Sequence, residues 1–388
     1  MNIPAEYKAI RPYEPEEMAA AFESLFADAE FCAIVQQLYP GVPVGTLKAQ
    51  LLTCTSTLDF QKKFIYRLAT GILSKCCDAY DMDATAMADR AGSYTFISNH
   101  RDIVLDAAIL NLLLLENGFR TTVEIAIGDN LLARPWIETV VKLNKSFIVR
   151  RGLGVREMLA ASKLMSGYMH FAVGEKHENI WIAQREGRAK DSNDRTQESL
   201  LKMMALGGTG TPAERLRALH IVPLAISYEY DACDFLKAKE FQQKRDNADF
   251  KKSKADDVLN MKTGIFGYKG RVHYCAAPCI DAWLTTHADL PKAELFAATA
   301  AHIDREIHRR YRLFPNNYAA ADLLSGTAAH AGAGRYTPEE KARFERYLTG
   351  QLAKIDLPNK DEAYLRERLL TMYAYPVINQ EAAAAAAP

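Results

Sequence analysis

Short apolar runs, rich in branched and aromatic residues, alternate with longer segments of helical periodicity in the middle of the chain. The runs predict strands over residues 94–98, 121–127, 146–150, 179–184, 221–228 and 271–277. Such alternation is typical of an α/β fold, with a mostly parallel central sheet that is covered by helices on both faces.

The two ends of the chain have a different pattern. Residues 15–39 carry apolar side chains at helical spacing, and the helical pattern returns after about residue 290. The small-residue run 325–334 is expected to form a loop, and the alanine-rich end, 381–388, to fray. We therefore expect three parts: a helical N-terminal region (1–90), an α/β domain (91–290) and a helical C-terminal region (291–388).

Composition excludes several classes of protein. Lys and Arg together number 48, as do Asp and Glu, so the net charge is zero. This argues against attraction of the whole protein to nucleic acid. No apolar run reaches the roughly 20 residues that cross a bilayer, although contact with a membrane surface stays open. The polar tract 237–257 is expected to form an exposed helix or loop.

Cysteine usage bears on metal binding and on the cellular compartment. The seven cysteines form no CxxC pair, and Cys275 and Cys279 have the spacing CxxxC, which is not that of a common zinc motif. We therefore expect no metal site. The odd number of cysteines and the polar start of the chain predict a reducing cytosol.

Polar residues of a consistent kind follow four of the predicted strands. In open parallel sheets, ligands bind beyond the carboxyl ends of the strands, so these residues are expected to share one site. The four groups are Asn99, His100, Arg101 and Asp102; Gly128, Asp129 and Asn130; Arg150, Arg151 and Gly152; and Gln184, Arg185, Glu186, Gly187 and Arg188.

The residue types in these groups suggest a reaction. A neutral histidine takes a proton from an alcohol when a carboxylate holds its other ring nitrogen, and Asp102 and Asp106 both lie close to His100 in the sequence. Arginines bind phosphate strongly. Each residue alone is as well explained by helix capping or by a solvated surface, but the joint pattern favours a pocket for a phosphorylated alcohol.

Two other motifs do not hold. His100-Arg101-Asp102 matches the start of a kinase catalytic loop, but Ala107 stands where that loop has asparagine. The segment 208–213 imitates a dinucleotide fingerprint but follows a helical pattern instead of a strand, so we expect a loop there.

Four sequence blocks, in this order, resemble the glycerol-phosphate and lysophosphatidate acyltransferases. They are NHRDIVLD (99–106), GDNLLARPWIETVVKLNKSFIVRRG (128–152), REGRAKD (185–191) and IVPLAISYEYD (221–231). The second block is more similar to the glycerol-3-phosphate branch.

The resemblance implies an O-acyltransferase of phospholipid biosynthesis. His100 would be the general base, oriented by a carboxylate. Arg101, Asn130, Arg150, Arg151 and the Glu186-Gly187-Arg188 turn would bind the acceptor phosphate, and Gly128 and Pro223 would shape the pocket. The acyl donor would be a thioester on coenzyme A or acyl carrier protein, with no cofactor and no metal. We expect a cytoplasmic protein, peripheral at the inner membrane face, with the helices of 1–90 or after 290 as candidates for membrane contact.

The sequence departs from the family pattern in two places. The family leaves four residues between histidine and aspartate; Asp106 has five between and Asp102 has one. The third block also reads Glu-Gly-Arg, one residue shorter than usual. The acceptor therefore stays open between glycerol 3-phosphate, 1-acylglycerol 3-phosphate and another lipid alcohol such as an acyl-amino-acid lipid. A catalytically silent lipid- or anion-binding protein and an unrelated α/β protein are the alternatives.

Overall fold

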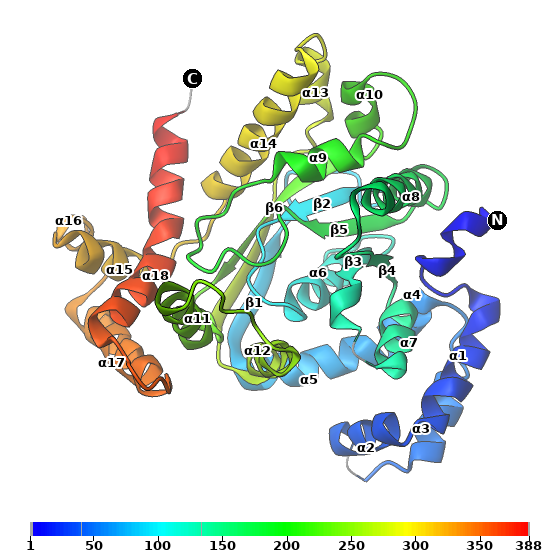
Figure 1. The fold of residues 1–388 in the computed structure, drawn as a ribbon, viewed down its shortest axis with the longest axis horizontal. Helices are drawn as coiled ribbons and strands as arrows, with labels where there is room; N and C mark the ends of the chain where they lie inside the picture. The colour runs from blue at the N-terminus through cyan, green and yellow to red at the C-terminus, as the bar shows by residue number, and fades with distance from the viewer. Residues whose placement is uncertain (1–2, 40, 133, 387–388) are drawn as a thin grey trace.

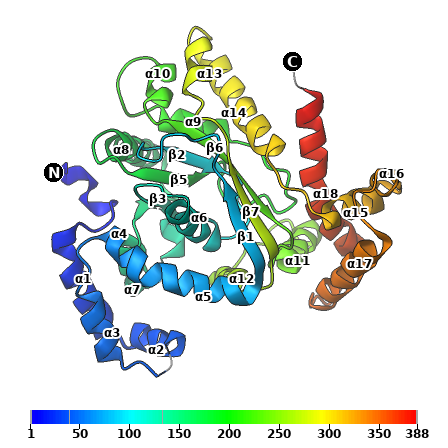
Figure 2. The same ribbon diagram turned by 180° about the vertical axis from the view of Figure 1, so that it is seen from behind.

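The computed structural model describes residues 3–39, 41–132 and 134–386 and has a seven-stranded sheet at its centre. Figure 1 shows the sheet between two groups of helices, and Figure 2 shows the same arrangement from behind. The strands are β1 (Cys77–Asp83), β2 (Thr95–Ser98), β3 (Val123–Gly128), β4 (Ser146–Val149), β5 (Asn179–Ala183), β6 (Ile221–Tyr228) and β7 (Gly270–Ala276).

Helices make up most of the rest of the chain. The longer ones are α1 (Pro15–Ala27), α2 (Ala29–Leu38), α3 (Val44–Leu51), α5 (Tyr66–Cys76), α6 (Leu105–Glu116), α7 (Pro135–Leu143), α8 (Val155–Gly174), α11 (Asp234–Asp246), α12 (Lys254–Phe266), α14 (Lys292–Arg309), α15 (Pro315–Ser325), α17 (Pro338–Ala353) and α18 (Glu362–Ala385). Shorter ones are η1 (Ala5–Ala9), α4 (Thr57–Phe60), η2 (Gln61–Ile65), η3 (Asp129–Leu131), α9 (Glu198–Met204), α10 (Pro212–Arg217), α13 (Asp281–Thr286) and α16 (Ala329–Gly332).

The sheet has the order β1-β7-β6-β2-β5-β3-β4. Every neighbouring pair is parallel except β6 and β7, which run antiparallel. The predicted α/β fold with a mostly parallel sheet is confirmed. All six predicted strands are present, with ends that differ by at most two residues.

Strand β1 lies in the N-terminal region, where the sequence predicted helices, so that prediction is wrong for Cys77–Asp83. The segment CDAYDMD has the residues of an edge strand: its side chains are exposed or half-buried, and only one neighbour, β7, pairs with it. A strand buried on one face or on none lacks the apolar run that reveals a central strand.

Two apolar layers cover the faces of the sheet. Along β6, which is buried throughout, Ile221 and Ala225 pack against α8, α9, α10, α13 and α14, whereas Val222, Leu224 and Ile226 pack against α5 and α6. The alternation follows from the two-residue period of a strand. Because both faces of the sheet are covered by apolar side chains, polar side chains gather at the ends of the strands.

The terminal helices form two further cores, which Figure 1 shows on opposite sides of the sheet. Helices α1 to α3 pack around Phe22 with α7, and α15, α17 and α18 pack around Phe344 with α11. Helix α11 belongs to the tract that was expected to be exposed. That prediction is wrong for Lys237 and Glu240, which are buried.

Two predictions about small-residue segments have mixed outcomes. Helix α18 continues through the alanine run to Ala385, whereas residues 387–388 lie outside the described residues. The run 325–334, expected to be a loop, contains the single turn α16. Within the described part of the chain, none of the helices combines the length and apolarity needed to cross a membrane.

Candidate functional site

His100 and Asp106 form a close pair immediately after β2. Asn99 first ties the end of β2 to β6: its side chain donates to the Ile226 carbonyl and accepts from the Ile226 amide, both at 2.8 Å. His100 then lies with its Nδ1 2.7 Å from Asp106 Oδ2. The histidine is 13% exposed, whereas the Asp106 side chain, in the first turn of α6, is fully buried.

The buried carboxylate fixes the histidine tautomer that the pair supports. An ionised carboxylate only accepts hydrogen bonds, so Nδ1 carries the proton and Nε2 is left with a lone pair. The Arg101 amide donates to the same Asp106 oxygen at 2.6 Å, and the His100 ring packs edge-on against Trp181 with the ring centroids 5.6 Å apart. The ring is therefore held on two sides while Nε2 is available as a base.

Asp102 has a different position, which separates the two carboxylates that the sequence left open. Its Oδ1 accepts from the amides of Val104, at 2.9 Å, and Leu105, at 2.8 Å. Asp102 thus caps the start of α6, and the turn that it stabilises holds the extra residue between His100 and Asp106. Burial raises the pKa of Asp102, and the charge of Asp106 raises it further.

Arg101 is buried and paired inside the protein. Its Nη2 lies 2.7 Å from Asp194 Oδ2, and Tyr311 donates to the same oxygen at 2.6 Å. The guanidinium that the sequence assigned to the acceptor phosphate is therefore already balanced by a carboxylate. No sequence pattern pointed to Asp194, which lies 93 residues further along the chain.

The second and third sequence blocks meet beyond β3, β4 and β5. Gly128 ends β3 so close to its neighbours that an added Cβ would lie 2.5 Å from Asn130 Oδ1 and 2.6 Å from Arg151 Nε. Arg151 Nη1 is 2.8 Å from Glu186 Oε1, and Arg150 is exposed beside it. Because β5 lies between β2 and β3, these groups and the His100 pair occupy adjacent strand ends.

Several buried polar atoms at these strand ends have no hydrogen-bond partner among the residues that the structure describes. They are Asp106 Oδ1, both side-chain polar atoms of Gln184, Arg185 Nε and Arg188 Nη1. Arg188 uses its other terminal nitrogen on Asn260, at 2.9 Å. Buried polar groups normally have partners, so this part of the molecule is suited to polar ligand atoms or water. Gln184 and Arg185 follow β5 directly, where the sequence placed them among the polar residues at the strand ends.

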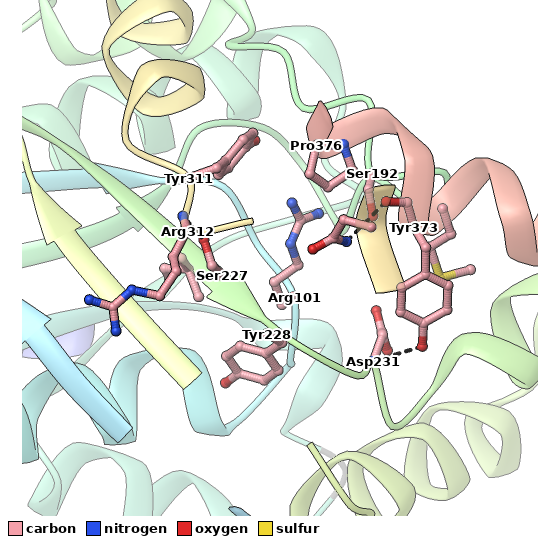
Figure 3. Close-up of a pocket in the computed structure, with 12 residues that line it drawn as sticks. Arg101, Ser192, Ser227, Tyr228, Asp231, Tyr311, Arg312, Tyr373 and Pro376 are labelled. Carbon is pink, nitrogen blue, oxygen red and sulfur yellow. Dashed lines mark hydrogen bonds between the residues drawn. The ribbon is translucent and has the colours of Figure 1, made fainter. Parts of the chain in front are cut away.

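A small cavity adjoins the His100 loop on the side of β6 and α18. Figure 3 shows Arg101 between Tyr311 and Asp231, with Tyr373 and Pro376 of α18 opposite. The remaining lining residues are Ser192, Ile226, Ser227, Tyr228, Arg312, Asn317 and Met372. His100 and Pro223 are not among them.

Pro223, expected to shape the pocket, lies inside β6, where it is aligned with Ile97 of β2. Lys237, which the sequence placed on an exposed segment, supports the cavity instead. It pairs with Asp231 and donates to the Arg101 carbonyl at 3.3 Å. The Lys237–Asp231 ion pair therefore holds the loop that carries His100.

No family model matches this sequence, and a search of curated proteins finds no match either. Among solved structures, the chain is similar to the 1-acyl-sn-glycerophosphate (LPA) acyltransferase PlsC from Thermotoga maritima, with 8% sequence identity and a TM-score of 0.35. The match covers 74% of this chain and 96% of that one. At this level of overlap, the chemistry has to be inferred from the residues of the site.

Proposed function

We propose that this protein is an O-acyltransferase that moves a fatty acyl group from a coenzyme A or acyl-carrier-protein thioester to the hydroxyl of glycerol 3-phosphate. The 2.7 Å contact between His100 Nδ1 and the buried Asp106 carboxylate is the observation that carries the proposal. It provides a base at the edge of the sheet where ligands of parallel folds bind. The order of the four sequence blocks supports the same class.

In the proposed reaction, His100 Nε2 takes the proton of the acceptor hydroxyl as its oxygen attacks the thioester carbon. The carbon–sulfur bond then breaks, and the leaving thiolate receives the proton from His100, so that an ester and a thiol are formed. Asp106 stabilises the imidazolium that exists between these steps. Because the acceptor oxygen itself attacks, no nucleophilic side chain is needed.

The acceptor phosphate would bind to arginines at the neighbouring strand ends. Arg188 and Arg185 each have a buried nitrogen without a partner within the described residues, and Arg150 is exposed. Arg151 and Asn130 border the same edge, with the Glu186-Gly187 turn holding Arg151. Arg101 would not bind the phosphate directly, because Asp194 already balances its charge.

Contact with a membrane surface fits a lipid product, and exposed apolar side chains suggest where it would occur. Val155, Met158 and Leu159 at the start of α8 are 88%, 51% and 52% exposed. The segment 150–159 carries three arginines and one acidic residue. It follows β4 directly, at the carboxyl edge of the sheet. This segment is a better candidate for peripheral binding at the cytoplasmic face of the membrane than the terminal helices.

The test is an assay of purified protein with acyl-coenzyme A and, separately, acyl carrier protein, offering glycerol 3-phosphate and 1-acylglycerol 3-phosphate side by side. His100→Ala is the test variant. His220→Ala is its matched control, because His220 also forms a His–Asp pair, with Asp281 at 2.6 Å, before β6 at the opposite edge of the sheet.

We expect acylation of glycerol 3-phosphate that is lost in His100→Ala and kept in His220→Ala. If only 1-acylglycerol 3-phosphate were acylated, the assigned acceptor would be wrong but the assigned mechanism would stand. Activity that survives in His100→Ala would refute the mechanism. Phosphate-ligand binding without turnover, insensitive to His100, would instead support a silent binding protein.

A further inference from the structure

A histidine, a cysteine and an aspartate meet at the edge of the sheet opposite to His100. His220 lies in the turn between α10 and β6, whereas Cys279 and Asp281 follow β7, with Asp281 opening α13. Because β6 and β7 are antiparallel, the start of one lies beside the end of the other, and the Ile280 amide donates to the Ile221 carbonyl at 2.9 Å. Figure 1 and Figure 2 both show α10 and α13 side by side here.

The donor atoms of the three residues converge. His220 Nδ1 is 2.6 Å from Asp281 Oδ2, and the single ligand atoms of the three side chains lie within 4.8 Å of one another. Cys279 is a free thiol, and Asp281 Oδ1 is buried without a partner within the described part of the chain. Ligands at about 2.0–2.3 Å from a tetrahedral zinc ion lie roughly 3–4 Å apart, so small side-chain rotations would complete the site.

The mixture of donors selects the ion. An imidazole nitrogen and a thiolate suit Zn²⁺, whereas Mg²⁺ and Ca²⁺ prefer oxygen ligands throughout. We propose that His220, Cys279 and Asp281 bind one Zn²⁺ ion, with a water molecule as the fourth ligand. The spacing of the cysteines along the chain argued against zinc, because the histidine of this cluster is distant from Cys279 in the sequence. The antiparallel strand pair supplies one from 59 residues upstream.

The proposed ion stabilises the fold and takes no part in acyl transfer. β2 and β6 are parallel, with Thr95 aligned to Ile221, so His220 lies at the edge where these two strands begin and His100 at the edge where they end. The ion would link the turn before β6 to the turn after β7. Binding to the folded chain alone raises its thermal stability in proportion to the logarithm of the zinc concentration.

The experiment uses the full-length protein, stripped with a chelator and then titrated with Zn²⁺ by calorimetry, with thermal unfolding followed in parallel. The test variants are Cys279→Ser and His220→Asn. Cys275→Ser is the matched control, because it removes a half-buried thiol from the same strand end without touching the cluster. Circular dichroism checks that each variant is folded; His220 is half-exposed, so its replacement leaves the core intact.

We expect one Zn²⁺ per chain and a rise in the unfolding temperature with zinc. Both effects should be retained in Cys275→Ser, and affinity should fall by about tenfold or more in each test variant. Co²⁺ in place of Zn²⁺ should give a thiolate charge-transfer absorption that Cys279→Ser abolishes. Binding that is equal in wild type and Cys279→Ser, or absent from the wild type, would overturn the proposal.

Discussion

Replacing Gly264 by alanine tests how α12 holds the loop that carries the His–Asp pair. Gly264 is buried in α12, and a Cβ added there would lie 2.0 Å from Asp102 Oδ2. This is far inside van der Waals contact. Either α12 moves away from the loop, or Asp102 rotates and gives up the amides that it caps at the start of α6.

The expected change in the free energy of unfolding combines one favourable contribution, the helix propensity of alanine, with two unfavourable steric ones. Alanine in a helix gains about 0.5–1 kcal/mol over glycine. Overpacking costs about 1–3 kcal/mol, and losing the cap costs about 1 kcal/mol more. The steric terms are larger, so Gly264→Ala should lower the free energy of unfolding by about 1–3 kcal/mol.

Gly71→Ala is the matched control. Gly71 lies inside α5, is exposed, and has nothing within 4 Å of the position where a Cβ would stand. Only the helix term applies, so this variant should be more stable than the wild type by about 0.5–1 kcal/mol.

Urea unfolding of the two variants and the wild type, compared at equal slope, measures the difference. Activity is the second measurement: acyl transfer should fall in Gly264→Ala and not in Gly71→Ala. If Gly264→Ala were as stable as Gly71→Ala, the contact between α12 and Asp102 would not constrain the loop, and the reasoning would be refuted.

Three other predictions follow from the structure. Asp106→Asn keeps an acceptor near His100 but removes its charge, so kcat should fall by about 10²–10⁴ with a much smaller change in KM; steady-state kinetics with an unchanged kcat would contradict the assigned role. Burial raises the pKa of Asp234 from 3.8 to about 7, so the folded chain binds this proton more tightly than the unfolded chain. The free energy of unfolding of the wild type should therefore fall by about 2–3 kcal/mol more than that of Asp234→Asn between pH 5 and pH 8. Urea unfolding that gave the same pH dependence for both proteins would contradict this. Met158→Asp should weaken co-sedimentation with anionic vesicles more than Ser199→Asp, which adds the same charge at another exposed helix position; equal weakening would point to charge alone.

The sequence revealed the sheet and the strand ends because burial on both faces produces continuous apolar runs. Its alignment with the acyltransferase pattern favoured Asp106 but left Asp102 open, because the choice depends on how a short turn directs two side chains a few residues apart. The turn is set by amide hydrogen bonds to Asp102. Nor could spacing reveal that Arg101 is paired with Asp194, since that contact joins residues far apart in the chain.

Tertiary packing also changes what a charged segment does. The tract that contains Lys237 has the composition of a solvated helix, yet Lys237 is buried and pairs with Asp231 beneath the Arg101 carbonyl. A lysine in such a place is retained because a carboxylate and a carbonyl replace its water.

The helical C-terminal region is part of the site's architecture and not an appendage to the sheet. Tyr373 and Pro376 of α18 form one wall of the cavity whose opposite wall is Arg101, and the Tyr373 hydroxyl accepts from the Asp231 amide at 3.1 Å. The same Asp231 pairs with Lys237, which holds the loop of His100. A shift of α18 would therefore reach the loop of the His100–Asp106 pair through three successive polar contacts. We accordingly expect the selectivity for the acceptor to depend on residues of the C-terminal helices as well as on the arginines at the strand ends.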